Sequence, residues 1–212
     1  MEVTGDTRFD RVATVRTVAR EFPLIANMVK DAAFTLVMGS SWEPDEDIVI
    51  PYFNSHPEMK LILAPHEFDR ERLLELMGRI KRKAVLYSQA NSNNIQGVDC
   101  MVIDSFGLLS SLYRYGQAAY VGGGFGSGIH NINEAAVYGI PVIFGPRFQK
   151  FREACDLVAR QGAFSITNAD EFAVHMDRLL TDAGHLHSTG ETAAAYIKEN
   201  LGATQRIYDH IF

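Results

Sequence analysis

The sequence predicts an α/β fold built on a doubly wound, mostly parallel sheet of six strands. From residue 34 onward, short β-branched or aromatic runs alternate with longer helical patterns. Several of these runs are apolar without alternation, as expected of parallel strands covered by helices on both faces. A 212-residue chain with 47% hydrophobic residues also suffices for the continuous core of one such domain.

Each expected strand is a short apolar run that a turn or a helical pattern follows. Ligands of such a sheet bind at the carboxyl ends of the strands, which directs attention to the residues just after each run. The six expected strands are Phe34–Met38, Lys60–Ala64, Ala84–Tyr87, Cys100–Ile103, Ala118–Gly122 and Pro141–Phe144.

The expected helices have recognisable start and stop residues. Asp69 is placed to cap a helix over 70–82, and Asp104 or Ser105 to cap one over 106–115. Asn131 is placed to begin a helix over 132–138, which Gly139 ends. The other helical patterns cover 10–31 with an interruption at Pro23, then 150–161, 169–181 and most of 189–211.

Composition excludes several classes of protein. With 20 Lys+Arg against 26 Asp+Glu the formal charge is −6, and no dense basic run exists, so nucleic acid is not an expected partner. The longest apolar stretches have the length of a strand, which predicts a soluble chain without a membrane span. Cys100 and Cys155 lie in different expected elements, which argues against a disulfide framework and favours a reducing compartment.

A glycine-rich loop, Gly122–Gly128, leaves the fifth expected strand and leads to the helix beginning at Asn131. Its five glycines let the backbone approach a ligand closely, and the unpaired N–H groups of a helix start favour an anion. Glu134 lies one turn into that helix, where its carboxylate can accept hydrogen bonds from two neighbouring hydroxyls such as those of a ribose. These features predict a nucleotide or nucleotide-sugar site.

Other chemistries lack their residue patterns. The dinucleotide spacing G-x-G-x-x-G fails because Ile129 stands where its last glycine would be, and no phosphate loop of the G-x-x-x-x-G-K-[ST] type occurs. His185 and His187 have no acidic partner at helical spacing, so no metal site is expected. Ser40 and Ser127 lie outside any G-x-S-x-G, which disfavours acyl transfer.

Several motifs in order along the chain resemble one family, the 3-deoxy-D-manno-octulosonic acid (Kdo) transferases. The most specific part runs from the glycine loop through His130–Ala136 to Gly139–Pro146, and the resemblance covers the whole chain but only the C-terminal half of that family. The other matching segments are Gly5–Asp10, Gly39–Ser41, Leu63–His66 and Asp104–Gly107.

The resemblance implies the Rossmann-like C-terminal domain of a two-domain GT-B glycosyltransferase. Such an enzyme moves Kdo from CMP-Kdo to a lipid A precursor at the cytoplasmic face of the inner membrane, in lipopolysaccharide biosynthesis. On this basis residues 1–31 are an interdomain linker with the first helices, and 32–212 are the CMP-Kdo-binding domain. The N-terminal acceptor domain, which holds the general base, is absent from this chain, so we expect the chain alone to bind CMP without transferring Kdo.

The family's donor contacts carry over to three segments of this sequence. Arg8 takes the place of a family lysine and would offset negative charge on the departing CMP phosphate, in a scheme with no cofactor and no metal ion. Two departures are that His66 replaces an arginine and Leu108 an acidic residue. The nucleotide-binding residues so implied are Pro65, His66, Phe106, Gly107, Leu108, Asn131, Ile132, Asn133 and Glu134, with Glu134 on the ribose.

Three other functions remain open from the residues themselves. A transferase or epimerase that uses a UDP sugar shares the same architecture and a similar glutamate on a helix. A non-catalytic nucleotide-binding module is the second alternative, and an NAD-dependent oxidoreductase without its fingerprint is the third. In addition, we expect an exposed apolar patch on 193–197 and 207–212, where these helices would face the absent domain.

Overall fold

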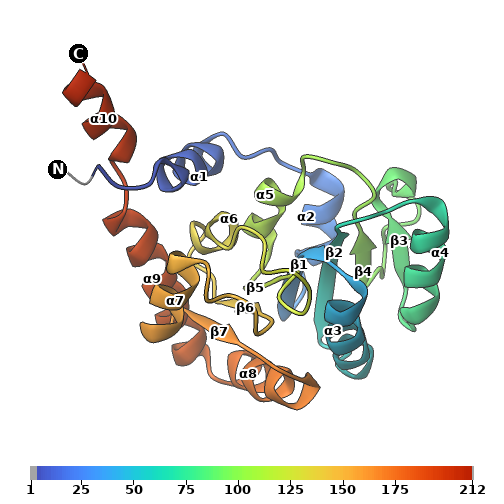
Figure 1. The fold of residues 1–212 in the computed structure, drawn as a ribbon. Helices are drawn as coiled ribbons and strands as arrows, with labels where there is room; N and C mark the ends of the chain where they lie inside the picture. Colours follow the sequence, from blue (N-terminus) through green and yellow to red (C-terminus); the bar gives the residue numbers. More distant parts are fainter. Residues whose placement is uncertain (1–3, 212) are drawn as a thin grey trace.

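Seven strands, one more than the sequence predicts, form the central sheet of the computed structural model, which describes residues 4–211 (Figure 1). Every strand pair is parallel, and the order across the sheet is β3-β4-β2-β1-β5-β6-β7. The strands are β1 (Phe34–Ser41), β2 (Met59–Pro65), β3 (Ala84–Leu86), β4 (Cys100–Val102), β5 (Ala118–Val121), β6 (Val142–Phe144) and β7 (Ala163–Ser165).

The six-strand prediction missed β7, whose residues Ala163–Ser165 include no β-branched side chain, unlike the equally short β6. A run that short carries no periodicity of its own, and β7 is recognised only because Ala163 and Phe164 pair in register with Val142 and Ile143 of β6. The long first strand carries the register of the sheet, since Leu36 pairs with Leu61 on one side and with Ala118 on the other.

Helices cover both faces, which confirms the doubly wound arrangement (Figure 1). Neighbouring residues of β1 point to opposite faces, so Val37 packs into one core, whereas Leu36 and Met38 pack into the other. One face carries α1 (Thr7–Thr17), α2 (Pro23–Val29), α5 (Leu109–Leu112), α6 (Asn133–Ala136), α7 (Arg152–Ala159) and α9 (Ala183–Glu199); the other carries α3 (Glu43–Ser55), α4 (Arg70–Arg79) and α8 (Ala169–Thr181).

Several helix boundaries differ from the prediction for local reasons. Pro23 does not interrupt a helix but begins α2, where a missing N–H costs nothing. The expected helix over 189–211 is two helices, α9 and α10 (Ala203–Ile211), separated by Gly202 at a φ of 92°. The sequence did not predict α3, in whose first turn the carboxylate of Asp45 accepts from the backbone N–H of Trp42 at 3.0 Å.

The two helices expected nearest the ligand edge are much shorter than predicted. The segment 106–115 contains only the four-residue α5 and a 3-10 turn over Tyr113–Tyr115. Asp104 caps neither, because its carboxylate accepts from the backbone N–H and the hydroxyl of Ser88. Asn131 also precedes only four helical residues, so the helix start there supplies a small dipole.

The predicted apolar patch is present only in part. Ala193, Tyr196 and Ile197 of α9 are buried in the core, which contradicts that half of the prediction. On α10, by contrast, Tyr208 and Ile211 are exposed, and Phe212 lies outside the described residues. Among residues 4–211, no helix is both long and apolar enough to cross a bilayer.

Candidate functional site

The carboxyl ends of β1 and β5 lie side by side at the point where the strand order reverses. From β1 the chain continues to β2 on one side, and it later crosses from β4 to β5 on the other. Open parallel sheets bind their ligands at such a switch point. The backbone N–H of Gly122, at the end of β5, donates to the carbonyl of Gly39 in β1 at 2.9 Å, which joins the two strand ends.

The glycine loop is packed so tightly that several of its glycines are needed for space alone. A Cβ on Gly122 would lie 2.3 Å from the carbonyl oxygen of Ser40, and one on Gly124 would lie 2.6 Å from the Gly145 backbone. Gly123 has a φ of 94° and Gly128 one of 142°, values that other residues rarely adopt. This close packing fixes the course of the backbone beside the switch point.

Much of the loop's hydrogen-bonding capacity is already used within the protein. The N–H groups of Gly126 and Gly128 both donate to the Gly123 carbonyl, at 2.9 and 3.2 Å. The N–H of Gly123 donates to the carboxylate of Asp45 at 2.9 Å. The loop therefore offers an anion fewer free N–H donors than its five glycines suggest, because these three N–H groups already donate within the protein.

Asp45, a residue that the sequence analysis did not select, fastens this loop to α3. Its fully buried carboxylate accepts hydrogen bonds from the N–H of Gly123, the N–H of Trp42 at 3.0 Å and the hydroxyl of Tyr120 at 2.8 Å. Burial raises the pKa of Asp45, and these three hydrogen bonds oppose the rise. Only the folded arrangement reveals this role, since Asp45 and Gly123 are 78 residues apart in sequence.

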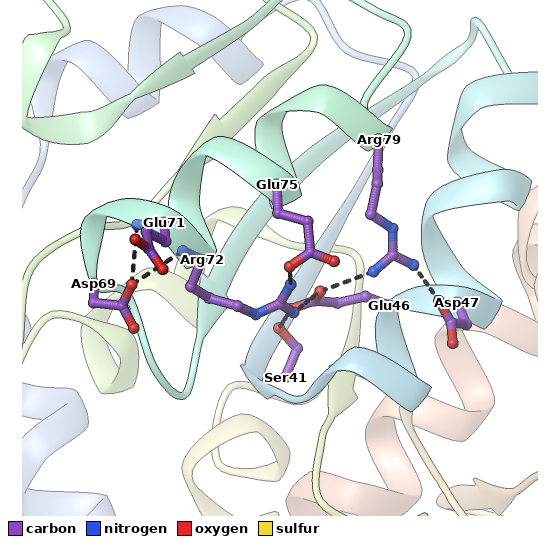
Figure 2. Close-up of polar contacts among 8 residues, drawn as sticks. All are labelled: Ser41, Glu46, Asp47, Asp69, Glu71, Arg72, Glu75 and Arg79. Carbon is purple, nitrogen blue, oxygen red and sulfur yellow. Dashed lines mark hydrogen bonds and ion pairs between the residues drawn. The ribbon is translucent and has the colours of Figure 1, made fainter.

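A second buried carboxylate joins α3 to α4 (Figure 2). Glu46 is 0% exposed, and it accepts from the Ser41 hydroxyl at 2.9 Å and forms ion pairs with Arg72 and Arg79 of α4. Asp69 caps α4 as predicted, by accepting from the N–H groups at 71 and 72. Because α4 follows β2 after a short loop, this network fixes the position of the loop between β2 and α4, which contains His66.

The first cavity at the strand ends unites two predicted ligand segments. It has a volume of about 220 Å³, and Pro65 and His66 from the end of β2 meet Phe106 and Gly107 from beyond β4 in its wall. Phe106 is 83% exposed and packs against Phe68 with ring centroids 4.4 Å apart. An exposed aromatic ring at a cavity rim provides a flat apolar surface.

Three aromatic side chains cluster beside this cavity. The ring of Trp42 stacks on His66 at 4.4 Å, and His66 lies 4.7 Å from His130. The indole N–H of Trp42 donates to Nε2 of His130 at 3.4 Å. Burial, followed by the charge of His66, lowers the pKa of His130, so this ring is neutral near pH 7.

A second cavity, of about 230 Å³, lies on the other side of α5, between α1 and α6. Glu134 and Asn131 line it from α6, and the amide of Asn131 donates to the Glu134 carboxylate at 3.2 Å. Burial raises the pKa of Glu134, while this hydrogen bond and the charge of Arg11 oppose the rise. Glu134 is thus partly exposed to a cavity and available to accept further hydrogen bonds.

Arg8 lines the same cavity but already has two acidic partners. Its guanidinium forms ion pairs with Asp6 at 2.7 Å and with Glu153 at 2.9 Å. Glu153 is only 5% exposed on its side chain, so the pair is anchored in α7. The hydrogen bond to Asp6 is the largest cause that raises the pKa of Arg8. Asp6 and Glu153 therefore already offset the positive charge of Arg8, the residue that the family resemblance places beside the departing phosphate.

Three of the predicted ligand residues have side chains in the core. Leu108 and Ile132 are buried apolar residues, so only their backbones are available to a ligand. Asn133 is also fully buried, and neither its amide nitrogen nor its amide oxygen has a hydrogen-bond partner within residues 4–211. In the same part of the chain no cluster of three or more histidine, cysteine or acidic side chains is arranged to hold a metal ion.

No family model matches the sequence. Among curated proteins, the chain is similar to a 3-deoxy-D-manno-octulosonic acid transferase of Aquifex aeolicus, with 30% identity over 152 residues, which is 69% of this chain and 42% of that protein. A transferase of the same description from Rickettsia typhi is 26% identical over 183 residues, 82% of this chain and 38% of its own length. The chain thus spans about two fifths of these relatives.

Solved structures share the fold. The C-terminal CMP-Kdo binding domain of an Acinetobacter baumannii protein superimposes with a TM-score of 0.69 at 19% identity, over 90% of this chain and 97% of that one. An Anabaena protein in complex with UDP-glucose superimposes with a TM-score of 0.58 at 16% identity, over 90% of this chain and 52% of its own. The α/β architecture is that of GT-B glycosyltransferases.

Proposed function

We propose that this chain, which is a C-terminal domain of the Kdo transferase type, binds the donor CMP-Kdo at the carboxyl ends of β1 and β5. One observation carries the proposal: of three segments far apart in sequence, two share a cavity, and the third lines a second cavity that also contains a residue of α5. Pro65 and His66 share a cavity wall with Phe106 and Gly107, and a second cavity across α5 contains Glu134. Two adjacent cavities separated by a short helix suit the separate parts of a nucleotide.

Glu134 is the residue that we assign to the ribose. Its carboxylate keeps free acceptor positions beside the single hydrogen bond from Asn131, and a carboxylate can accept from both hydroxyls of a diol. Phe106 and Gly107, whose φ of 75° suits a glycine, form the rim across which the nucleotide enters. We assign the phosphate to the segment at Asn131, because Asn131 and Arg8 line the same cavity; the dipole of the four-residue α6 adds little.

In the proposed reaction, a hydroxyl oxygen of the acceptor attacks the anomeric carbon of Kdo, and the bond from that carbon to the CMP phosphate oxygen breaks. The acceptor loses its proton to a base, and CMP leaves with the bonding electron pair. Arg8 would offset charge on the departing phosphate, which requires its guanidinium to exchange Asp6 for the donor while Glu153 holds it in place.

We propose that the acceptor-binding site and the general base lie in the part of the relatives that this chain does not cover; the match spans 42% of the Aquifex aeolicus protein. We propose that a lipid A precursor is the acceptor, that the whole protein works at the cytoplasmic face of the inner membrane, and that residues 1–31 are a linker. On these premises the 212-residue chain binds CMP but transfers no Kdo, and no cofactor or metal ion takes part.

A UDP-sugar transferase or epimerase is the second candidate, because a neighbour in fold is complexed with UDP-glucose. Calorimetric titration of CMP and of UMP into the chain separates the two functions. We expect CMP to bind more tightly, and tighter binding of UMP would overturn the Kdo assignment.

Glu134→Gln tests the ribose contact. Charge-assisted hydrogen bonds contribute about 1.5–3 kcal/mol each, so the variant should bind CMP at least roughly tenfold more weakly. Its effect on 2′-deoxy-CMP should be smaller, because one hydroxyl is already missing. Glu58→Gln, an exposed change before the amino end of β2, is the matched control and should leave both affinities unchanged. Unaltered CMP binding by Glu134→Gln would refute the contact.

A further inference from the structure

Trp42 and His130 meet beside the ligand edge of the sheet, and neither belongs to the binding residues that the family resemblance implies. Trp42 directly precedes α3, whereas His130 lies between the glycine loop and α6. Their rings and that of His66 form the aromatic cluster described above, in which the indole N–H of Trp42 donates to Nε2 of His130 at 3.4 Å. A group that can only donate therefore faces one ring nitrogen of His130.

The same buried carboxylate holds the backbones on which the two rings are carried. Asp45 accepts from the N–H of Trp42 at 3.0 Å and from that of Gly123 at 2.9 Å. His130 is joined to the same loop, since its backbone N–H donates to the carbonyl of Gly122 at 3.1 Å. The indole and the imidazole are therefore placed relative to each other by contacts that do not involve the rings themselves.

The indole N–H determines which nitrogen of His130 carries the hydrogen. A neutral imidazole has one N–H and one bare nitrogen, and the hydrogen bond made by one nitrogen sets the state of the other. Because the indole can only donate, Nε2 is the bare nitrogen that accepts, and the hydrogen is on Nδ1. Burial lowers the pKa of His130, which keeps the ring in this neutral form near pH 7.

The Nδ1 atom of His130 points away from the glycine loop. A Cβ placed on Gly123 would lie 3.0 Å from Cδ2 and 3.4 Å from Nε2 of the ring, so this edge of the imidazole faces the loop, and Nδ1 is the ring atom opposite it. His130 is half-buried, and across the described residues 4–211 no protein group forms a hydrogen bond with Nδ1. The ring thus presents one N–H donor that a ligand at the strand ends can use.

Most other donors at this edge are already used. The N–H groups of Gly123, Gly126 and Gly128 donate within the protein, and the guanidinium of Arg8 is paired with two carboxylates. The Nδ1–H of His130 has no such partner to give up. Because the fold also holds its hydrogen in place, it needs no rearrangement when a ligand arrives.

We propose that Trp42 is a positioning residue that acts through His130, by keeping the hydrogen of that ring on Nδ1, where it donates to an anionic oxygen of the donor. This role rests on the proposed function and deepens it, since CMP-Kdo carries anionic oxygens on its phosphate and on the carboxylate of its sugar. A hydrogen bond from an N–H to a charged oxygen is stronger than one between neutral groups. Without the indole N–H the hydrogen can move to Nε2, and Nδ1 then faces the anion as a bare nitrogen.

Trp42→Phe tests this role, because it keeps an aromatic ring beside His66 and removes the N–H donor. Long-range proton–nitrogen NMR spectra distinguish the two tautomers of a histidine ring. We expect the hydrogen of His130 on Nδ1 in the wild type and mainly on Nε2 in Trp42→Phe. The affinity for freshly prepared CMP-Kdo, measured by calorimetric titration, should fall by about tenfold in the variant.

Titrations of CMP and cytidine identify the anion. A fall for both CMP-Kdo and CMP, with cytidine unchanged, places Nδ1–H on the phosphate, whereas a fall for CMP-Kdo alone places it on the carboxylate of the sugar. His130→Ala should weaken the same ligands, and adding Trp42→Phe to it should have no further effect, because the tryptophan acts through the histidine. His187→Ala, an exposed change on α9, is the matched control and should leave all three affinities as they are.

An unchanged affinity for CMP-Kdo in Trp42→Phe would overturn the proposal, as would additive effects of the two substitutions or an equal loss for cytidine, which carries no anion. A hydrogen on Nε2 of His130 in the wild type would overturn it as well, because Trp42 would then not set the tautomer. If the wild type bound neither CMP nor CMP-Kdo, the proposed function itself would fail, while the NMR spectra would still show which nitrogen carries the hydrogen. The two failures are therefore distinguishable.

Discussion

Replacing Asp45 by alanine tests how the glycine loop is held. The substitution leaves two buried backbone N–H groups, of Gly123 and Trp42, and the hydroxyl of Tyr120 without an acceptor. Each unsatisfied buried donor costs about 1–3 kcal/mol, so the loss should reach about 3 kcal/mol or more. For a domain of this size, 3 kcal/mol corresponds to a fall in melting temperature of roughly 6–12 °C.

Asp45→Asn is the matched variant for this experiment. The asparagine oxygen can accept from both N–H groups, and its amide can donate to Tyr120, so the cost should be within about 1 kcal/mol. Because burial raises the pKa of Asp45 above its ordinary value of 3.8, the native state holds this proton more tightly than the unfolded chain. Its contribution to stability therefore falls as the pH rises from 3.8, and Asp45→Asn should remove that dependence.

Urea unfolding gives the stability, and CMP titration well below the melting temperature gives the effect on the site. We expect folded Asp45→Ala to bind CMP more weakly than Asp45→Asn, because the loop beside His130 loses its anchor. If Asp45→Ala proved as stable as Asp45→Asn and bound CMP equally well, the assignment of Asp45 as the anchor of the loop would be wrong.

Three further predictions concern the same edge of the sheet. In urea unfolding, Gly124→Ala should lower the free energy of unfolding by about 2 kcal/mol or more, since its Cβ would lie 2.6 Å from the Gly145 backbone. Gly126→Ala is the control and should be neutral or slightly stabilising, because the nearest atom to its Cβ would be 3.5 Å away. Glu46→Ala should cost about 3 kcal/mol by the same measurement, because it leaves two arginines without their buried partner; equal stability to wild type would contradict this. In an NMR pH titration, the pKa of His130 should be below its ordinary value of 6.5, and it should rise in the His66→Ala variant. Because the unfolded chain binds this proton more tightly, stability should fall as the pH drops below 6.5.

The sheet was largely predictable because its strands are continuous apolar runs. Burial on both faces requires such runs, and β1, β2 and β5 carry no polar alternation to obscure them. The seventh strand was not predictable, since Ala163–Ser165 contains no β-branched residue and forms a strand through its pairing with β6. The short helices α5 and α6 were overestimated because their flanking turns contain residues that also suit a helix.

The strand ends predicted which candidate residues are neighbours in the fold, whereas their partners could not be predicted. Pro65 and His66 share a cavity wall with Phe106 and Gly107, and Glu134 lines a second cavity. Their role in binding a nucleotide stays a prediction. Spacing along the chain did not indicate Asp45, whose role depends on partners that meet only in the folded chain. The pairing of Arg8 with Glu153 could not be predicted either, because the two residues are 145 positions apart in the sequence.

Mapping the bound nucleotide by NMR tests the central claim most directly. In amide spectra recorded while CMP is added to the isotope-labelled chain, we expect the signals of His66, Gly107 and Glu134 to shift together and to saturate with one dissociation constant. Signals of Gln96 and Gly97, which lie before β4 at the opposite edge of the sheet, should stay in place. Shifts confined to other parts of the chain, or no saturable shift with CMP, would contradict a donor site at the carboxyl ends of β1 and β5.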